Sequence, residues 1–90
     1  MRRFFFPIFD SLGFIPDDEG RELPSAEHAR DHALEGARSL LGAEILTGKL
    51  DLRGRIEVTD DRGNVIEVVP FEGVLDILRG AFPSNGESGR

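Results

Sequence analysis

The chain contains no cysteine, no tryptophan and no tyrosine, and it has a single methionine. Without cysteine, neither disulfides nor thiolate-based metal sites can form, and a cysteine nucleophile is excluded. The composition therefore fits a reducing compartment. Long apolar runs are lacking as well, since none approaches the roughly 20 residues that a membrane-spanning helix needs. The sequence predicts neither a disulfide-stabilised secreted domain nor a transmembrane helix.

Positive charge is also scarce. The 90 residues include 17 acidic and 11 basic side chains, which gives a formal net charge of −6. Arg2 and Arg3 are the one adjacent pair of arginines. Because an acidic chain repels phosphate backbones, we expect no nucleic-acid partner. The apolar start ends at Asp10 without a signal-type cleavage site, so we expect a cytoplasmic protein that does not contact membranes.

Phenylalanine is concentrated at the start of the chain, where residues 2–9 read RRFFFPIF. Aromatic and β-branched residues favour strands, so we predict a strand over residues 3–9. Alternation along this strand puts Phe4, Phe6 and Ile8 on one face. The opposite face then carries Phe5, Pro7 and Phe9. Because both faces are apolar, we expect the core to cover one of them, and either the same chain or a partner to cover the other.

A short strand and one long helix are predicted after the opening strand. A short strand is expected near residues 14–15, before a polar turn at 16–20. Ser25 is a good N-cap, and Gly48 is placed to end the helix that follows. Apolar residues in this helix recur at spacings of three and four and form one stripe: Ala26, Ala29, Ala33, Ala37, Leu40, Leu41 and Ile45.

A hairpin is predicted from strands at 55–59 and 65–69, joined by a turn at 60–64. We expect Ile56, Val58, Ile66 and Val68 on one face. The other face is expected to carry Glu57 and Glu67, together with Val65 and Val69. Residues 71–78 have the spacing of a short amphipathic helix. We therefore predict a single α+β domain over residues 1–79, with an antiparallel sheet and one main helix on one face. The element order is β-β-α-β-β followed by the short C-terminal helix, and residues 80–90 form a disordered tail.

Several segments of this order resemble a family of short uncharacterised bacterial proteins, which is a domain of unknown function. The resemblance rests on RFFF at 3–6, IPDDEGRELP at 15–24, the alanine-rich segment 26–41, GRIEVTD at 54–60 and VPF at 69–71. It covers nearly all of residues 3–78 and implies no activity. Many members of the family carry a polar residue, often His or Asp, at the position of Pro7.

A looser similarity is to the HicB-like antitoxin fold. It covers mainly residues 4–41, where two strands precede an alanine-rich helix entered through an acidic turn. The resemblance implies a protein that neutralises a small toxin nuclease. No C-terminal DNA-binding segment of the kind found in many such proteins is evident.

The polar residues suggest no catalytic, metal or cofactor site. His28 and His32 are spaced as two ligands on one helix face, with Glu35 beside them, but no enclosing loop supplies further ligands. The acidic segment 17–22 lacks the alternation of a calcium loop and is read as a solvated turn. No Ser–His motif or glycine-rich phosphate loop is recognised. We therefore expect no catalytic residues, no metal and no cofactor, and a protein that is not an enzyme.

The two-sided opening strand leads to a functional hypothesis. One helix can cover only one face of the sheet, which leaves a candidate association surface on the other face: Phe5, Phe9, Val65 and Val69. Two chains stacking such faces would form a homodimer. The alternative is that residues 71–78 fold back and cover this surface. We predict a small, self-associating protein-interaction module. An antitoxin-like or regulatory protein that binds a small toxin or nuclease is second, and an enzyme with carboxylate chemistry is third.

Overall fold

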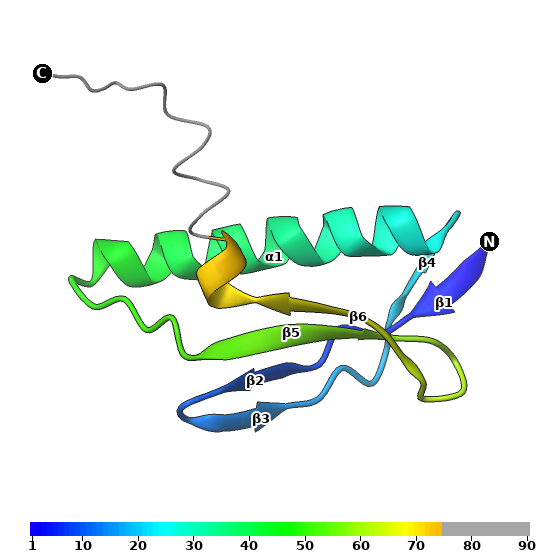
Figure 1. Ribbon diagram of the computed structural model, residues 1–90, viewed down its shortest axis with the longest axis horizontal. Coiled ribbons are helices and arrows are strands. Elements are labelled where there is room, and N and C mark those ends of the chain that lie inside the picture. The colour runs from blue at the N-terminus through cyan, green and yellow to red at the C-terminus, as the bar shows by residue number, and fades with distance from the viewer. Residues whose placement is uncertain (75–90) are drawn as a thin grey trace, which may run out of the picture.

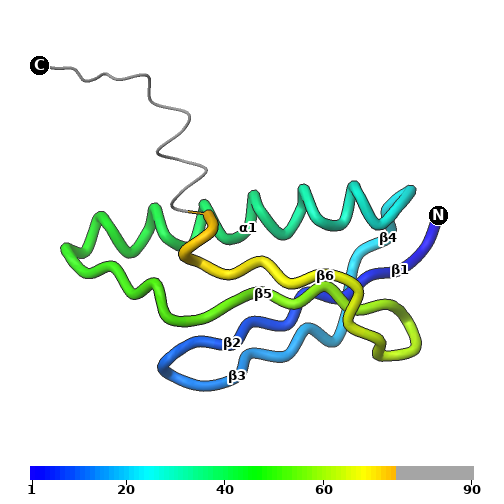
Figure 2. The backbone as a smooth tube through the Cα atoms, viewed as in Figure 1, coloured from blue at the N-terminus to red at the C-terminus, as the bar shows by residue number. Residues whose placement is uncertain are grey.

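The structure is a computed structural model that describes residues 1–74. The predicted domain end at residue 79, the helix beyond residue 74 and the tail at 80–90 lie outside the described residues. Within residues 1–74, Figures 1 and 2 show one long helix running along a twisted sheet. The α+β class, the antiparallel pairing of the strands and the main helix are confirmed.

The larger sheet has four strands, β2 (Ile8–Asp10), β3 (Gly13–Ile15), β5 (Gly54–Thr59) and β6 (Val65–Pro70). Their order is β3-β2-β5-β6, and all neighbours are antiparallel. Asp10 closes the turn between β2 and β3, because its Oδ1 accepts hydrogen bonds from the backbone N–H groups of Leu12 at 2.9 Å and Gly13 at 3.1 Å. The predicted hairpin of β5 and β6 forms the other half of the sheet.

The opening segment is two strands rather than one, with β1 (Arg2–Phe4) separated from β2 by residues 5–7. Proline has no N–H to donate, so the ladder is interrupted at Pro7. The segment still follows β5, since the Pro7 carbonyl accepts from the Glu57 N–H at 3.0 Å. The Phe6 N–H donates instead to Asp17 Oδ2 at 2.9 Å. The acidic turn therefore satisfies a backbone donor of the opening segment.

A second sheet of two strands pairs β1 with β4 (Arg21–Leu23), which the sequence did not reveal. Arg2 lies opposite Leu23, and Phe4 lies opposite Arg21. A three-residue strand with two charged side chains has no period that distinguishes it from a loop. Four strands therefore precede the helix, rather than two.

The helix α1 spans Ala26–Leu46. Ser25 is its N-cap as predicted, and its Oγ accepts from the His28 N–H at 3.3 Å. Thr47 is the C-cap, and Gly48 follows with a φ of +83°, so the helix ends where the sequence indicated. The apolar stripe buries Ala29, Ala33, Ala37 and Leu41.

The core lies between α1 and one face of the sheet. The helix packs against β4, β5 and β6, and a helical turn at residues 71–74 lies on the same side (Figure 1). Ten apolar residues form this core: Phe4, Ala29, Ala33, Ala37, Leu41, Ile56, Val58, Val69, Phe71 and Val74. Phe6 and Ile8 pack at its margin, so the predicted inward face of the opening segment is correct.

Candidate functional site

The face of the four-stranded sheet that points away from α1 holds three of the four predicted surface residues. Cross-strand partners share a face, so the pairs Phe9–Arg55, Phe5–Thr59 and Thr59–Val65 put Phe5, Phe9 and Val65 on one side. This is the side opposite Ile56 and Val58, which lie in the core. Within residues 1–74 no helix packs on it.

The fourth residue, Val69, does not belong to this surface. Val69 is only 4% exposed and pairs with Ile56 in the core, whereas Val68 is 44% exposed and pairs with Glu57 on the far side. The prediction had the two valines exchanged. Because β6 is apolar on both faces, its alternation does not fix the register, and a slip of one residue reverses every side chain. The register shifts by one residue between Val58 and Thr59, so Thr59 lies opposite Val65.

Glu67 confirms the register independently. It shares the helix-facing side of β6 with Val69, and its Oε2 lies 3.2 Å from Arg30 Nε of α1. The sequence had placed this glutamate on the far side of the sheet. Glu67 therefore forms an ion pair with Arg30 that links the sheet to α1 at the edge of the core.

We call the side of the sheet away from α1 the open face. It is formed by Phe5, Pro7, Phe9, Phe14, Arg55, Glu57, Thr59, Val65, Val68 and Pro70. Phe14, Val65 and Val68 are 56%, 51% and 44% exposed. The sequence did not predict Phe14 as a residue of the open face, because Phe14 lies on the short strand β3, whose pairing partner is not evident from the sequence. Its alternation with Ile15 could have indicated one outward side chain.

Aromatic and charged groups contact one another across the open face. The Phe9 and Phe14 rings lie with their centroids 4.8 Å apart and tilted by 33°. The Arg55 guanidinium lies 4.3 Å from the centroid of Phe9, and its Nε donates to Glu57 Oε2 at 2.8 Å. The Glu57 side chain is 16% exposed. The open face is thus an apolar surface that contains one ion pair.

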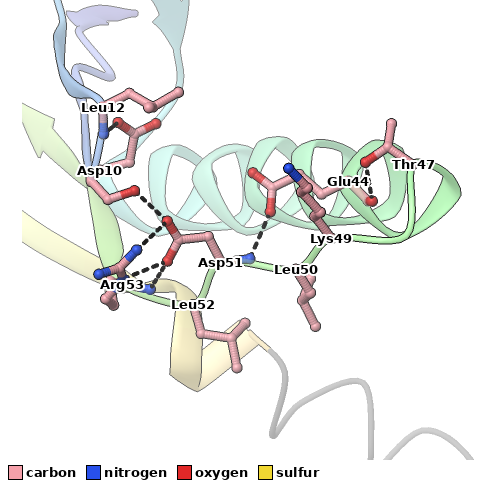
Figure 3. A pocket seen from close by; sticks show the side chains of 10 residues that line it. Asp10, Leu12, Glu44, Thr47, Lys49, Leu50, Asp51, Leu52 and Arg53 are labelled. Carbon is pink, nitrogen blue, oxygen red and sulfur yellow. Dashed lines mark hydrogen bonds and ion pairs between the residues drawn. The ribbon is translucent and has the colours of Figure 1, made fainter.

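A separate cavity of about 680 Å³ lies between the β2–β3 turn, the end of α1 and the loop that follows (Figure 3). Asp51 is held there by Arg53 and by Ser11, and its backbone N–H donates to Glu44 Oε1 at 3.0 Å. The hydrogen bonds from Arg53 and Ser11 hold the pKa of Asp51 far below its ordinary value. These groups bind one another and stabilise the loop, so the arrangement does not indicate a reactive group.

The two histidines line one open pocket of about 320 Å³, together with Asp31 and Glu35. His28 lies in the first turn of α1, where its Nδ1 is 2.8 Å from Oγ of the N-cap Ser25. His32 is half-buried and packs edge-on against Phe6, with the two ring centroids 4.7 Å apart. Among the first 74 residues, no group of three or more His, Asp or Glu side chains is placed to hold a metal ion. No helix in the same part of the chain is both long and apolar enough to cross a bilayer.

Comparison with protein families matches residues 3–72 to a domain of unknown function (DUF6894). No curated protein and no solved structure matches the chain. The predicted membership in a family of unknown function is confirmed, whereas the HicB-like similarity and the bacterial origin stay predictions. The match begins within β1, ends two residues after β6 and covers more than half of the chain, and on this basis the chain belongs to the DUF6894 family.

Proposed function

We propose that the protein is a small interaction module that self-associates through the open face. A single observation carries the proposal. A four-stranded sheet has its helix and residues 71–74 on one side, while the other side presents Phe9, Phe14 and Val68. Large contiguous apolar patches are uncommon on monomers and often mark interfaces. The alternative cover considered from the sequence, the C-terminal segment, packs on the helix side as far as residue 74.

Light scattering coupled to size exclusion tests the proposal on the full chain. We expect a dimer at micromolar concentration, and we expect Phe14→Ser to shift it to monomer. Phe14 is 56% exposed, so its replacement removes contact area without opening the core. Leu12→Ser is the matched control, because Leu12 is 95% exposed at the β2–β3 turn, outside the open face. A chain that stays monomeric at high micromolar concentration would contradict the proposal.

A second candidate is an antitoxin-like or regulatory protein that binds a small toxin or nuclease. The net charge of −6 supports it, since an acidic surface attracts a basic partner. Purification of the tagged chain from native cells, with mass spectrometry of the bound proteins, separates the two candidates. A basic protein bound in a salt-sensitive complex that Phe14→Ser abolishes would favour the second. Recovery of the chain with only its own untagged copy would favour the first.

A further inference from the structure

We propose that the self-association is a two-fold stacking of open faces in which Arg55 of each copy lies over Glu57 of the other. This inference rests on the proposed function and adds the arrangement of the partner. The placement of the two charges on the sheet supports it. Charge-reversal variants separate a failure of this arrangement from a failure of self-association.

The open face is organised in rows that cross the strands. One row crosses all four strands through consecutive cross-strand partners, in the order Phe14, Phe9, Arg55 and Pro70. The next row runs through Pro7, Glu57 and Val68, because the Glu57 N–H donates to the Pro7 carbonyl and Glu57 pairs with Val68. Arg55 and Glu57 therefore occupy neighbouring rows of the same strand, about 6.6 Å apart along it.

A two-fold axis that runs parallel to the rows and between them exchanges the two rows. Each strand of one copy then lies over the same strand of the other copy. The row of Arg55 in one copy lies over the row of Glu57 in the other. Phe9 of one copy is placed over Pro7 of the other, so apolar groups meet apolar groups. Stacked sheets lie about 10 Å apart, a distance that an arginine and a glutamate reaching toward each other span together. The same patch thus complements itself, as a two-fold interface requires.

Electrostatics favours this axis over one that runs along the strands. An axis along β5 would put Arg55 over Arg55 of the second copy, and Glu57 over Glu57 of the second copy. This is strongly unfavourable, because it buries like charges against each other. The crossed arrangement instead builds a network of four alternating charges. Within each copy, Arg55 Nε donates to Glu57 and the guanidinium lies over the Phe9 ring. Among residues 1–74 the terminal guanidinium nitrogens have no hydrogen-bond acceptor, so they can donate to the carboxylate of the second copy.

Charge reversal of single residues tests the arrangement. Arg55→Glu makes the two central charges of each copy negative, and Glu57→Arg makes them positive. We expect each variant alone to raise the dimer dissociation constant at least about tenfold, because every crossed pair becomes repulsive. Arg38→Glu and Glu35→Arg are the controls, since they make the same changes in net charge at exposed positions of α1. These controls are expected to dimerise as the natural sequence does.

The decisive measurement mixes the two variants. An equimolar mixture of Arg55→Glu and Glu57→Arg chains pairs a negative face with a positive one, so we expect a heterodimer by native mass spectrometry. Mixing restores the contact between copies but leaves the Arg55–Glu57 pair within each copy broken. A gain on mixing therefore also shows that both variants are folded.

The outcomes are separable. The crossed arrangement is wrong if the natural chain dimerises and both variants dimerise as tightly. It is also wrong if the mixture gains no heterodimer while circular dichroism shows folded chains. In both cases self-association of the natural chain stands. If the natural chain is a monomer, both proposals fail.

Discussion

At the scale of single residues, Gly54 shows how closely two segments approach at the start of β5. Its φ is +143°, and a Cβ built there would lie 2.5 Å from the Phe9 carbonyl oxygen and 3.1 Å from the Phe71 ring. The first contact is with backbone, which cannot rotate away. The position therefore requires glycine for both its conformation and its surroundings.

We predict that Gly54→Ala lowers the free energy of unfolding by about 1–3 kcal/mol. Gly42→Ala is the matched control, because a Cβ at Gly42 meets no atom within 4 Å and the residue lies inside α1. This second change is expected to stabilise the fold by about 0.5–1 kcal/mol. Urea denaturation of both variants measures the difference. Equal stability of Gly54→Ala and the natural chain would contradict the close approach.

Asp60 stabilises the turn between β5 and β6 at the same scale. Its Oδ1 accepts from the N–H groups of Asn64 and Arg62, each at 2.9 Å. These backbone donors, with Asn64 the stronger, hold the pKa of Asp60 below its ordinary value of 3.8. Because the carboxylate is favoured in the folded state, its stabilisation is present above that value. It is lost as the pH falls through the lower pKa of the folded chain.

We therefore predict that Asp60→Asn is less stable than the natural chain at pH 7 and that the difference shrinks below pH 3.8. Asparagine keeps an acceptor oxygen but removes the charge. Thermal melts of both proteins across this pH range measure the effect. A stability difference that is the same at neutral and acid pH would show that the carboxylate charge does not contribute.

At the scale of elements, the helix approaches the sheet along a row of alanines. Ala29, Ala33 and Ala37 are each at most 1% exposed. Their small side chains leave no room for a larger group between α1 and the strands beneath it. The spacing between these layers is thus set by side-chain size at three helix positions.

We predict that Ala33→Leu overpacks this layer and costs about 1–3 kcal/mol. Ala43→Leu, at an exposed position of the same helix, is the control, and we expect a change within about 0.5 kcal/mol. Melting temperatures of the two variants provide the comparison. An unchanged melting temperature for Ala33→Leu would mean that Ala33 does not face the sheet.

At the scale of the whole molecule, the fold is layered on one side only within residues 1–74. The helix and residues 71–74 share one side of the sheet, and the open face is the other. If the open face binds a second copy, association and folding are linked, because only the folded chain presents the assembled surface.

We accordingly predict that the melting temperature of the natural chain rises with protein concentration over a roughly hundredfold range. Phe14→Ser should remove this dependence, while Leu12→Ser should keep it. Scanning calorimetry at several concentrations provides the readout. A melting temperature independent of concentration in the natural chain would argue against a dimer coupled to folding.

The sequence by itself determined the elements whose signals are local. Ser25, Gly48 and the alanine stripe specify α1, and the alternation of residues 55–59 specifies β5. These signals arise within a few residues, so no distant contact is needed to recognise them. The inward face of Phe4, Phe6 and Ile8 was predictable for the same reason.

Only the tertiary structure decided which side of β6 is buried and which short segments pair as strands. Val68 and Val69 are chemically equivalent, and the register of β6 against Ile56 alone places one in the core and the other on the open face. β4 becomes a strand only because β1 lies beside it. The open face, with Phe14 beside Phe9 and Arg55 beside Glu57, is likewise a product of strand pairing. Its residues are far apart in sequence, and a local pattern holds no information about which strand will be the neighbour.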